Sequence, residues 1–505
     1  MYSQQKPSLV RALCVTIGLW LAFLATPAYA GACNQFAETH SAQELSEYTQ
    51  LMRHGQPAHY KAVIEKIKLV EVDDPDLLGP EISGSTLIRI PKGFLRFSCR
   101  MAQLQAYYMN NCCNRDIMVF RKRLDDCFSK GRNERECIED RLTSLIDALE
   151  TKYPLDEANL AFVKRLTKES FQFLLNHEAQ HPFIEDKKNE ENEADILGLF
   201  YHVAEGRLPI STVPYFSIMA MIDHKTADWS VEDHRPSACR AATIDAAIHH
   251  IGHELALVYT WLINPTEYPS LRRQPRRVET QKIFIAGDTA KCGEPLPVEA
   301  RRLRRDLDAM LNLLDRIAAN SEPSAIFTQL MTFKPATAPG RQLHSNILTF
   351  WVTNQVKPAI DQENKQAIII YKKWLTQIER SYALSSFSSE SYGRLIAYRA
   401  MINWHTGPKD TLLSDNIAKL RAGLDESESY YKPIGYTNSF RANISYLTGD
   451  CDGGRRYLDK VIETSGDGEA ARRNYAWRSQ IQNAEQCANI SRRLQEQVKA
   501  VQGWK

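Results

Sequence analysis

The sequence has almost no net charge. Its 63 lysines and arginines nearly balance 61 aspartates and glutamates, which leaves a formal charge of +2. Proteins that bind nucleic acid through their overall field carry a clear positive excess. The balance therefore argues against a dedicated nucleic-acid binder and leaves only local patches to consider.

Long apolar runs are also scarce. The one candidate, "LCVTIGLWLAFLA", follows Lys6 and Arg11, and "AYA" at 28–30 fits the small-x-small rule for cleavage. These features predict a signal peptide over residues 1–30. An uncleaved membrane anchor is the alternative, but the run is short for a membrane span. We expect a mature chain without a transmembrane span, in the periplasm or secreted.

Paired CxxC motifs are absent, which argues against a zinc ribbon. One of the 11 cysteines lies in the signal peptide, and the remaining ten are an even number. In an oxidising compartment this pattern predicts disulfides. Cys451 is a candidate partner of Cys487. A cysteine-rich insertion at about 98–150 holds five of the others: Cys99, Cys112, Cys113, Cys127 and Cys137.

Histidine is scarce too, with 13 in 505 residues, yet two stand close together in "NHEAQH". His177 and His181 are four residues apart, so both rings project from one face of a helix. Two neutral imidazoles in this arrangement can bind one Zn²⁺. Glu178 lies beside the first histidine, where a carboxylate can act as a general base. This is the HExxH pattern of zinc peptidases.

The third metal ligand is expected on the next helix, after Pro182 ends the first one. Glu190, Glu191 and Glu193 compete for this role. Glu191 shares one face with Ala194, Asp195 and Gly198, and the two small residues allow close approach to the HExxH helix. We therefore predict Glu191 as the ligand, with Asp195 accepting a hydrogen bond from a ligand histidine. A solvated charged helix with incidental histidines is the alternative.

The length suggests more than one domain. Short β-type runs, "LVEV" and "TLIRI", lie within 68–97, and most of the remaining chain has helical periodicity. Proline and arginine break this periodicity after residue 263. We predict a mostly α, α+β protein. Its predicted parts are a catalytic domain at 31–263, a linker at 264–300 and an α-helical domain at 301–505.

Near 441–490 the sequence resembles one tetratricopeptide unit, a helix pair that stacks on neighbours. Ala442, Ser445 and Tyr446 fall on one expected helix, and Gly454 and Leu458 on the next. Generic packing of α-helices is an equal contender. A helical region of either kind is expected to bind protein substrates or partners.

The motif "HEAQH" followed by "ENEADILG" resembles zinc metallopeptidases of the HtpX, BepA and CAAX-prenyl-protease type, which are gluzincins with the pattern HExxH…ExxAD. "VDDPDLLGPEISGSTLIRIPKGFL" and "DHRPSACRA" are similar to flanking segments of that family. The resemblance covers about 60–245. The interval between the second histidine and the third ligand is shorter than usual there, and the cysteine-rich insertion is unusual.

The resemblance implies one Zn²⁺ per chain on His177, His181 and Glu191, with Glu178 as general base. It also implies that His234 or Arg240 lies near the substrate oxyanion. We therefore expect an exported zinc endopeptidase that acts on protein or peptide substrates, with a role in quality control of envelope proteins. The alternative is a non-catalytic periplasmic binding or chaperone scaffold with a structural zinc.

Overall fold

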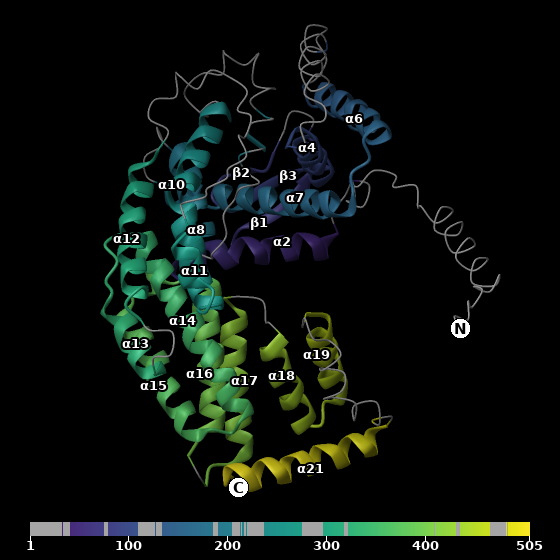
Figure 1. The fold of residues 1–505 in the computed structure, drawn as a ribbon. Coiled ribbons are helices and arrows are strands. Elements are labelled where there is room, and N and C mark those ends of the chain that lie inside the picture. The colour runs from purple at the N-terminus through teal and green to yellow at the C-terminus, as the bar shows by residue number, and fades with distance from the viewer. Residues whose placement is uncertain are drawn as a thin grey trace, which may run out of the picture.

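The computed structural model describes most of the chain outside the N-terminal segment and several loops. The described residues are 33, 41–74, 79–109, 127, 134–184, 190–204, 213, 215, 216, 219, 237–274, 296–317, 322–408, 410–430, 435–464, 481 and 483–505. They are mostly helical, as the sequence predicts, with one small sheet (Figure 1). The predicted signal peptide and His234 lie outside the described residues.

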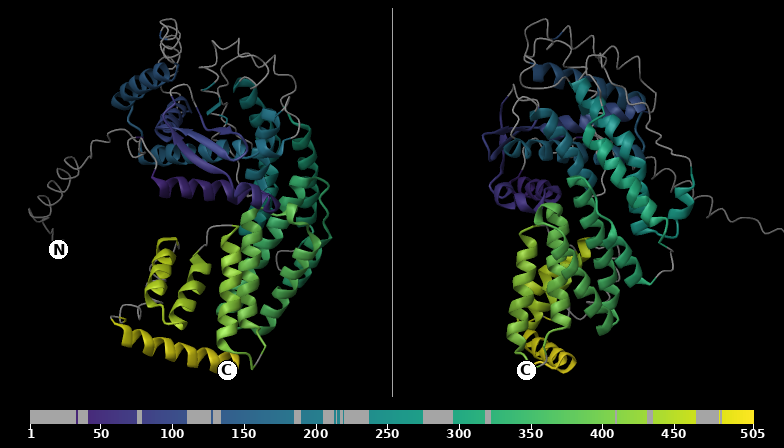
Figure 2. Two further views of the ribbon diagram at one scale, coloured as in Figure 1. Left: turned by 180° about the vertical axis from the view of Figure 1, so that it is seen from behind. Right: turned by 90° about the vertical axis from the view of Figure 1, so that its left-hand side faces the viewer.

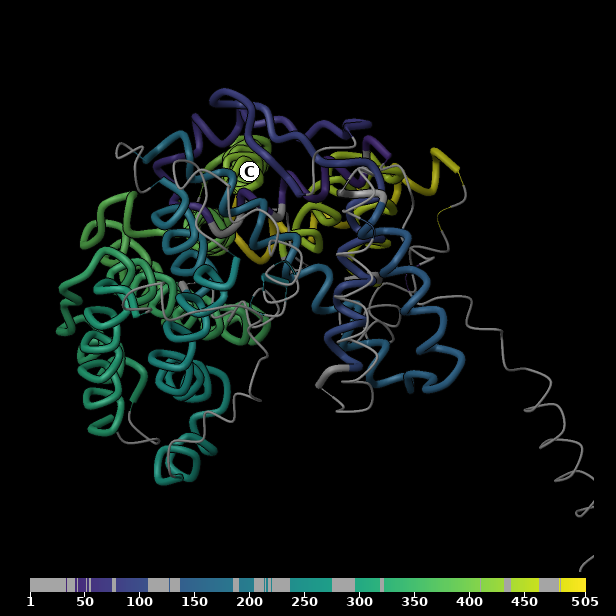
Figure 3. The backbone as a smooth tube through the Cα atoms, turned by 90° about the horizontal axis from the view of Figure 1, so that it is seen from above, coloured from purple at the N-terminus to yellow at the C-terminus, as the bar shows by residue number. Residues whose placement is uncertain are grey.

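The N-terminal half surrounds the sheet with helices. Its helices are α2 (Ala42–Gly55), α3 (Lys61–Ile64), α4 (Phe94–Met109), α6 (Glu134–Lys152), α7 (Glu157–Glu178), α8 (Glu190–Ala204), α10 (Ser237–Ile263) and α11 (Tyr268–Arg272), with the 3-10 turns η1 (Ala58–Tyr60) and η2 (His181–Phe183). Seen from above, α4 and α6 lie on one side and α10 on the other, and α7 spans the distance between them (Figure 3).

The sheet has three strands in the described residues, in the order β1-β3-β2. They are β1 (Lys68–Val72), β2 (Glu81–Ser83) and β3 (Leu87–Pro91). β1 pairs with β3 in parallel, and β2 pairs with β3 in the antiparallel sense. The runs "LVEV" and "TLIRI" are therefore strands, as predicted, and β2 is a further short strand at the end of the sheet.

The C-terminal half is an array of helices. They are α12 (Val298–Leu314), α13 (Pro323–Thr332), α14 (Ala338–Asp361), α15 (Lys365–Ser381), α16 (Ser389–His405), α17 (Leu413–Glu428), α18 (Gly435–Leu447), α19 (Cys451–Thr464) and α21 (Ala484–Gln502), with the 3-10 turn η5 (Leu384–Ser386). Helices α14 to α17 pack side by side, α12 packs against α10 and α14, and α21 crosses the far end of the array (Figures 1 and 2).

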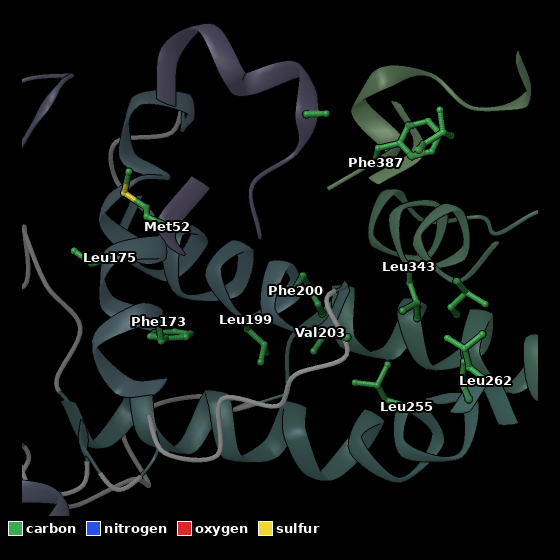
Figure 4. Packing of buried hydrophobic residues seen from close by; sticks show 14 of the residues in the cluster. Met52, Phe173, Leu175, Leu199, Phe200, Val203, Leu255, Leu262, Leu343 and Phe387 are labelled. Atoms are coloured by element: carbon green, nitrogen blue, oxygen red, sulfur yellow. The ribbon is translucent and has the colours of Figure 1, made fainter. Parts of the chain in front are cut away.

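The two halves share one hydrophobic core. Helix α10 packs against α12, and α8 packs against α14. Figure 4 shows side chains of α7, α8, α10 and α14 gathered in this cluster, among them Phe173, Phe200, Leu255 and Leu343, with Phe387 nearby. The stretch expected to link the halves contains α11, whose buried Tyr268 donates a hydrogen bond to Asp315.

Three disulfides join cysteines of the described residues: Cys33–Cys99, Cys127–Cys137 and Cys451–Cys487. The third is the predicted pairing, and it ties α19 to α21. Helices α18 and α19 form the helix pair expected near 441–490. A Cβ atom at Gly454 would come within 2.6 Å of the Tyr446 ring, so only glycine fits this contact. In the described part of the chain, no helix combines the length and apolarity needed to cross a bilayer.

Candidate metal centre

The HExxH motif begins in the last turn of α7 and ends at His181, the first residue of the 3-10 turn η2. Asp156 caps the start of α7 by accepting a hydrogen bond from the Asn159 N–H, and the helix ends at Glu178. The next two residues keep helix-like dihedral angles, with φ −69° and ψ −10° at Ala179 and φ −84° and ψ −30° at Gln180. His181 therefore remains on the same face as His177, one turn further on.

Helix α8 packs closely against this motif. Ala194 is fully buried, and a Cβ atom at Gly198 would lie 3.5 Å from the His177 backbone nitrogen. That distance is ordinary van der Waals contact, so a larger side chain at this position would push the helices apart. The small residues of α8 thus bring its acidic face against the two histidines, as the sequence predicts.

Glu191 completes a triangle with the two histidines. Its Oε2 lies 3.1 Å from His177 Nε2, and its Oε1 lies 3.5 Å from His181 Nε2. The two Nε2 atoms are 3.3 Å apart. His177, His181 and Glu191 thus form a group that could hold a metal ion. Their side chains are 2%, 10% and 13% exposed, respectively.

The dimensions of this triangle fit a small divalent cation. A tetrahedral zinc ion with ligand bonds of about 2.0–2.1 Å holds neighbouring ligand atoms roughly 3.3–3.4 Å apart. The observed separations of 3.1, 3.3 and 3.5 Å bracket this value. Two imidazoles and one carboxylate also leave a fourth position open, which is the donor set of catalytic zinc sites.

Asp195 lies behind His177, as predicted. Its Oδ1 is 3.0 Å from His177 Nδ1, so it fixes the ring with Nε2 directed at the centre. Burial alone would lower the pKa of His177, but hydrogen bonds to Asp195 and Glu191 outweigh it and raise the pKa to about 10. The surroundings of this ring therefore favour a positive charge, which is also what a metal ion would supply.

Arg240, on α10, holds Asp195 in turn. Its Nε and Nη2 each donate a hydrogen bond of 2.8 Å to one oxygen of Asp195. Burial opposes the charge on Asp195, but Arg240 and His177 together hold the pKa of this carboxyl well below its usual range. The guanidinium also stacks over the Phe216 ring, 4.3 Å from its centre. The expected role of Arg240 near an oxyanion stays a prediction.

Glu190 and Glu193 do not join the triangle. Glu190 instead lies beside the outer nitrogen of the second histidine, with its Oε1 2.9 Å from His181 Nδ1. Each ligand histidine therefore has its own carboxylate partner, Asp195 for His177 and Glu190 for His181. The sequence pattern identified the first of these partners and missed the second, although Glu190 is adjacent to the ligand.

Glu178 lies beside the triangle without belonging to it. Its Oε1 is 3.6 Å from His177 Nε2, and its Oε2 accepts a 2.9 Å hydrogen bond from the backbone N–H of Ile82 on β2. Burial is the largest influence on this carboxyl and raises its pKa to about 7, against the opposing effect of His177. No side-chain pattern could reveal the Ile82 contact, because the donor is a backbone group.

Comparisons of the chain with protein-family models, with curated proteins and with solved structures found no match.

Proposed function

We propose that the chain is an exported zinc-dependent endopeptidase that hydrolyses peptide bonds of protein substrates. The observation that carries this proposal is the position of Glu178, whose Oε1 lies 3.6 Å from His177 Nε2. A carboxylate beside a three-ligand set that leaves one position open is suited to proton transfer. A purely structural zinc site is closed by four protein ligands and needs no such group.

The residues of the centre have distinct roles in this proposal. His177, His181 and Glu191 would hold the zinc, and Asp195 and Glu190 would orient the two imidazoles. Bound zinc lowers the pKa of a water molecule and polarises a substrate carbonyl. Glu178 would take a proton from the attacking water and deliver it to the leaving amine.

The sheet edge offers a place for the substrate chain. β2 is one of the two end strands of the described sheet, and its Ile82 lies next to Glu178. An extended peptide can add to such an edge through backbone hydrogen bonds, which would carry its peptide bonds alongside the centre. An edge of this kind suits segments of unfolded protein better than small molecules.

The disulfides support a location outside the cytoplasm. Disulfides persist in oxidising compartments and are rare in reducing ones. The three pairs at Cys33–Cys99, Cys127–Cys137 and Cys451–Cys487 therefore favour export, in agreement with the predicted signal peptide. A role of the C-terminal helices in holding substrates or partners belongs to the same proposal.

The decisive experiment replaces Glu178 by glutamine. Glu178→Gln keeps the shape of the side chain but cannot accept the proton, so casein cleavage should fall by about two to four orders of magnitude while bound zinc is unchanged. Glu193→Gln is the matched control, because Glu193 lies outside the triangle, and it should cleave like the wild type. Full cleavage by Glu178→Gln, or no zinc-dependent cleavage by the wild type, would instead favour the non-catalytic scaffold with a structural zinc.

A further inference from the structure

A short backbone bridge connects the two halves of the chain next to the metal centre. The segment 56–58 lies antiparallel to 387–389, with Pro57 paired opposite Ser388. The Ala58 N–H donates a hydrogen bond of 2.8 Å to the Phe387 carbonyl, and the Ser389 N–H donates one of 2.8 Å to the Gln56 carbonyl. The C-terminal helical array thereby fixes the backbone of Gln56.

The side chain of Gln56 reaches from this bridge to the HExxH motif. Its Nε2 donates a 3.4 Å hydrogen bond to Asn176 Oδ1, and its Oε1 accepts a 2.7 Å hydrogen bond from Gln180 Nε2. Asn176 precedes His177, and Gln180 precedes His181. All three polar side chains are completely buried. If one of these hydrogen bonds is lost, water cannot replace it.

Gln180 compensates for a missing backbone bond at this point. Its own N–H donates to the His177 carbonyl instead of to Asn176, because α7 tightens at its last turn. The side-chain Nε2 of Gln180 supplies the Asn176 carbonyl with its donor, at 3.0 Å. The Gln180 side chain thus fixes the backbone between the two histidines. Gln56 fixes the Gln180 side chain by accepting a hydrogen bond from it.

We propose that Gln56 is a positioning residue, which couples the C-terminal helical array to the geometry of the metal centre. By fixing Asn176 and Gln180 it sets the separation of the two imidazoles, which a metal ion requires to within a few tenths of an ångström. The proposal rests on the proposed metal site, and its role in catalysis rests on the proposed peptidase activity.

The test compares two buried glutamine-to-methionine substitutions in the full-length protein. Gln56→Met keeps the approximate volume and removes both side-chain hydrogen bonds. Gln105→Met, at another buried glutamine, this one on α4, is the matched control. We expect zinc affinity, measured by competition with a chelator, to fall about 10- to 100-fold in Gln56→Met, the range known for groups that orient metal ligands. Gln105→Met should stay within twofold of the wild type.

A double-mutant cycle keeps the test informative if single variants are destabilised. Gln180→Met removes the partner of Gln56. The double variant should therefore have the same zinc affinity as whichever single variant binds zinc more weakly. Equal affinity of Gln56→Met and the control, or fully additive losses in the double variant, would overturn the proposal. In cleavage assays kcat should fall with KM unchanged. A wild type that binds zinc without cleaving would refute the peptidase and leave the affinity test valid.

Discussion

Arg240 holds both oxygens of Asp195, and Asp195 in turn contacts the outer nitrogen of His177. The arginine comes from α10, the carboxylate from α8 and the histidine from α7. This chain of contacts locks three helices around one imidazole. Because all three groups are buried, each depends on the others for compensation of its charge.

Replacing Arg240 should therefore be costly even without metal. Arg240→Met removes the arginine from its buried ion pair with Asp195, which should lower the free energy of unfolding by about 3–5 kcal/mol. Arg272→Met is the control, because the Arg272–Asp315 pair is about one-third exposed on both sides and should contribute about 0–1 kcal/mol. Urea unfolding in the presence of a chelator measures both. Equal losses for the two variants would contradict the assigned contribution of the buried pair.

The three neighbouring glutamates of α8 should differ sharply in metal binding. Glu191→Ala removes a ligand and should weaken zinc affinity by more than about 100-fold. Glu190→Ala removes the partner of His181 Nδ1 and should cost about 10- to 100-fold. Glu193→Ala should bind zinc normally. Equilibrium dialysis against a zinc buffer tests the order, and loss of metal in Glu193→Ala alone would show that the triangle is misassigned.

Acid should destabilise the C-terminal array through His344. Burial lowers the pKa of this histidine to about 3, against the opposing effect of a hydrogen bond with the Leu330 backbone and with a smaller contribution from Lys334. Between its unfolded pKa near 6.5 and pH 3, the unfolded state binds more protons, so stability is complete above about pH 6.5 and falls on acidification. The expected slope is about 1.4 kcal/mol per pH unit.

The contribution of His344 is the difference in slope between the wild type and His344→Asn. Urea unfolding from pH 4 to pH 7 should give a shallower dependence in the variant. Other titrating groups contribute to both proteins and largely cancel in the comparison. Parallel dependences would mean that His344 is not the group responsible.

The disulfide between α19 and α21 should stabilise the end of the array. Cys451 and Cys487 are 36 residues apart, for which loop closure predicts a contribution of about 4 kcal/mol. The double alanine variant should unfold at lower urea concentration, and α21 should become accessible to limited proteolysis at its N-terminal end. Its C-terminal end should stay protected, because Trp504 packs on Trp404. Unchanged stability would mean that the two helices are held by packing alone.

The sequence predicted the helices and the main residues of the centre because both depend on local spacing. Histidines four residues apart share a helix face, and α8 has the small residues that let Glu191 approach them. The observed α8, Glu190–Ala204, begins at the first of the three glutamates considered as the third ligand. The mostly helical class and the pairing of Cys451 with Cys487 were predicted on similarly local grounds.

The contacts that the sequence did not predict join residues far apart in the chain. The Ile82 N–H reaches Glu178, and Gln56 meets Asn176 and Gln180. Backbone donors and buried glutamines have no periodicity of their own, so their partners depend on how helices and strands pack in three dimensions. The pairing of Arg240 with Asp195 belongs to the same group, since α8 and α10 are separate in sequence.

The bridge between 56–58 and 387–389 also has a consequence for the order in which the protein matures. All the proposed metal ligands precede residue 387 in the chain, so a protein in which only the N-terminal half has folded would hold every ligand but lack one side of the bridge. Pairings of such long sequence separation form late in folding. A chain truncated before residue 387 should bind zinc weakly, and the centre would gain its full geometry only after the C-terminal half has folded against the N-terminal half.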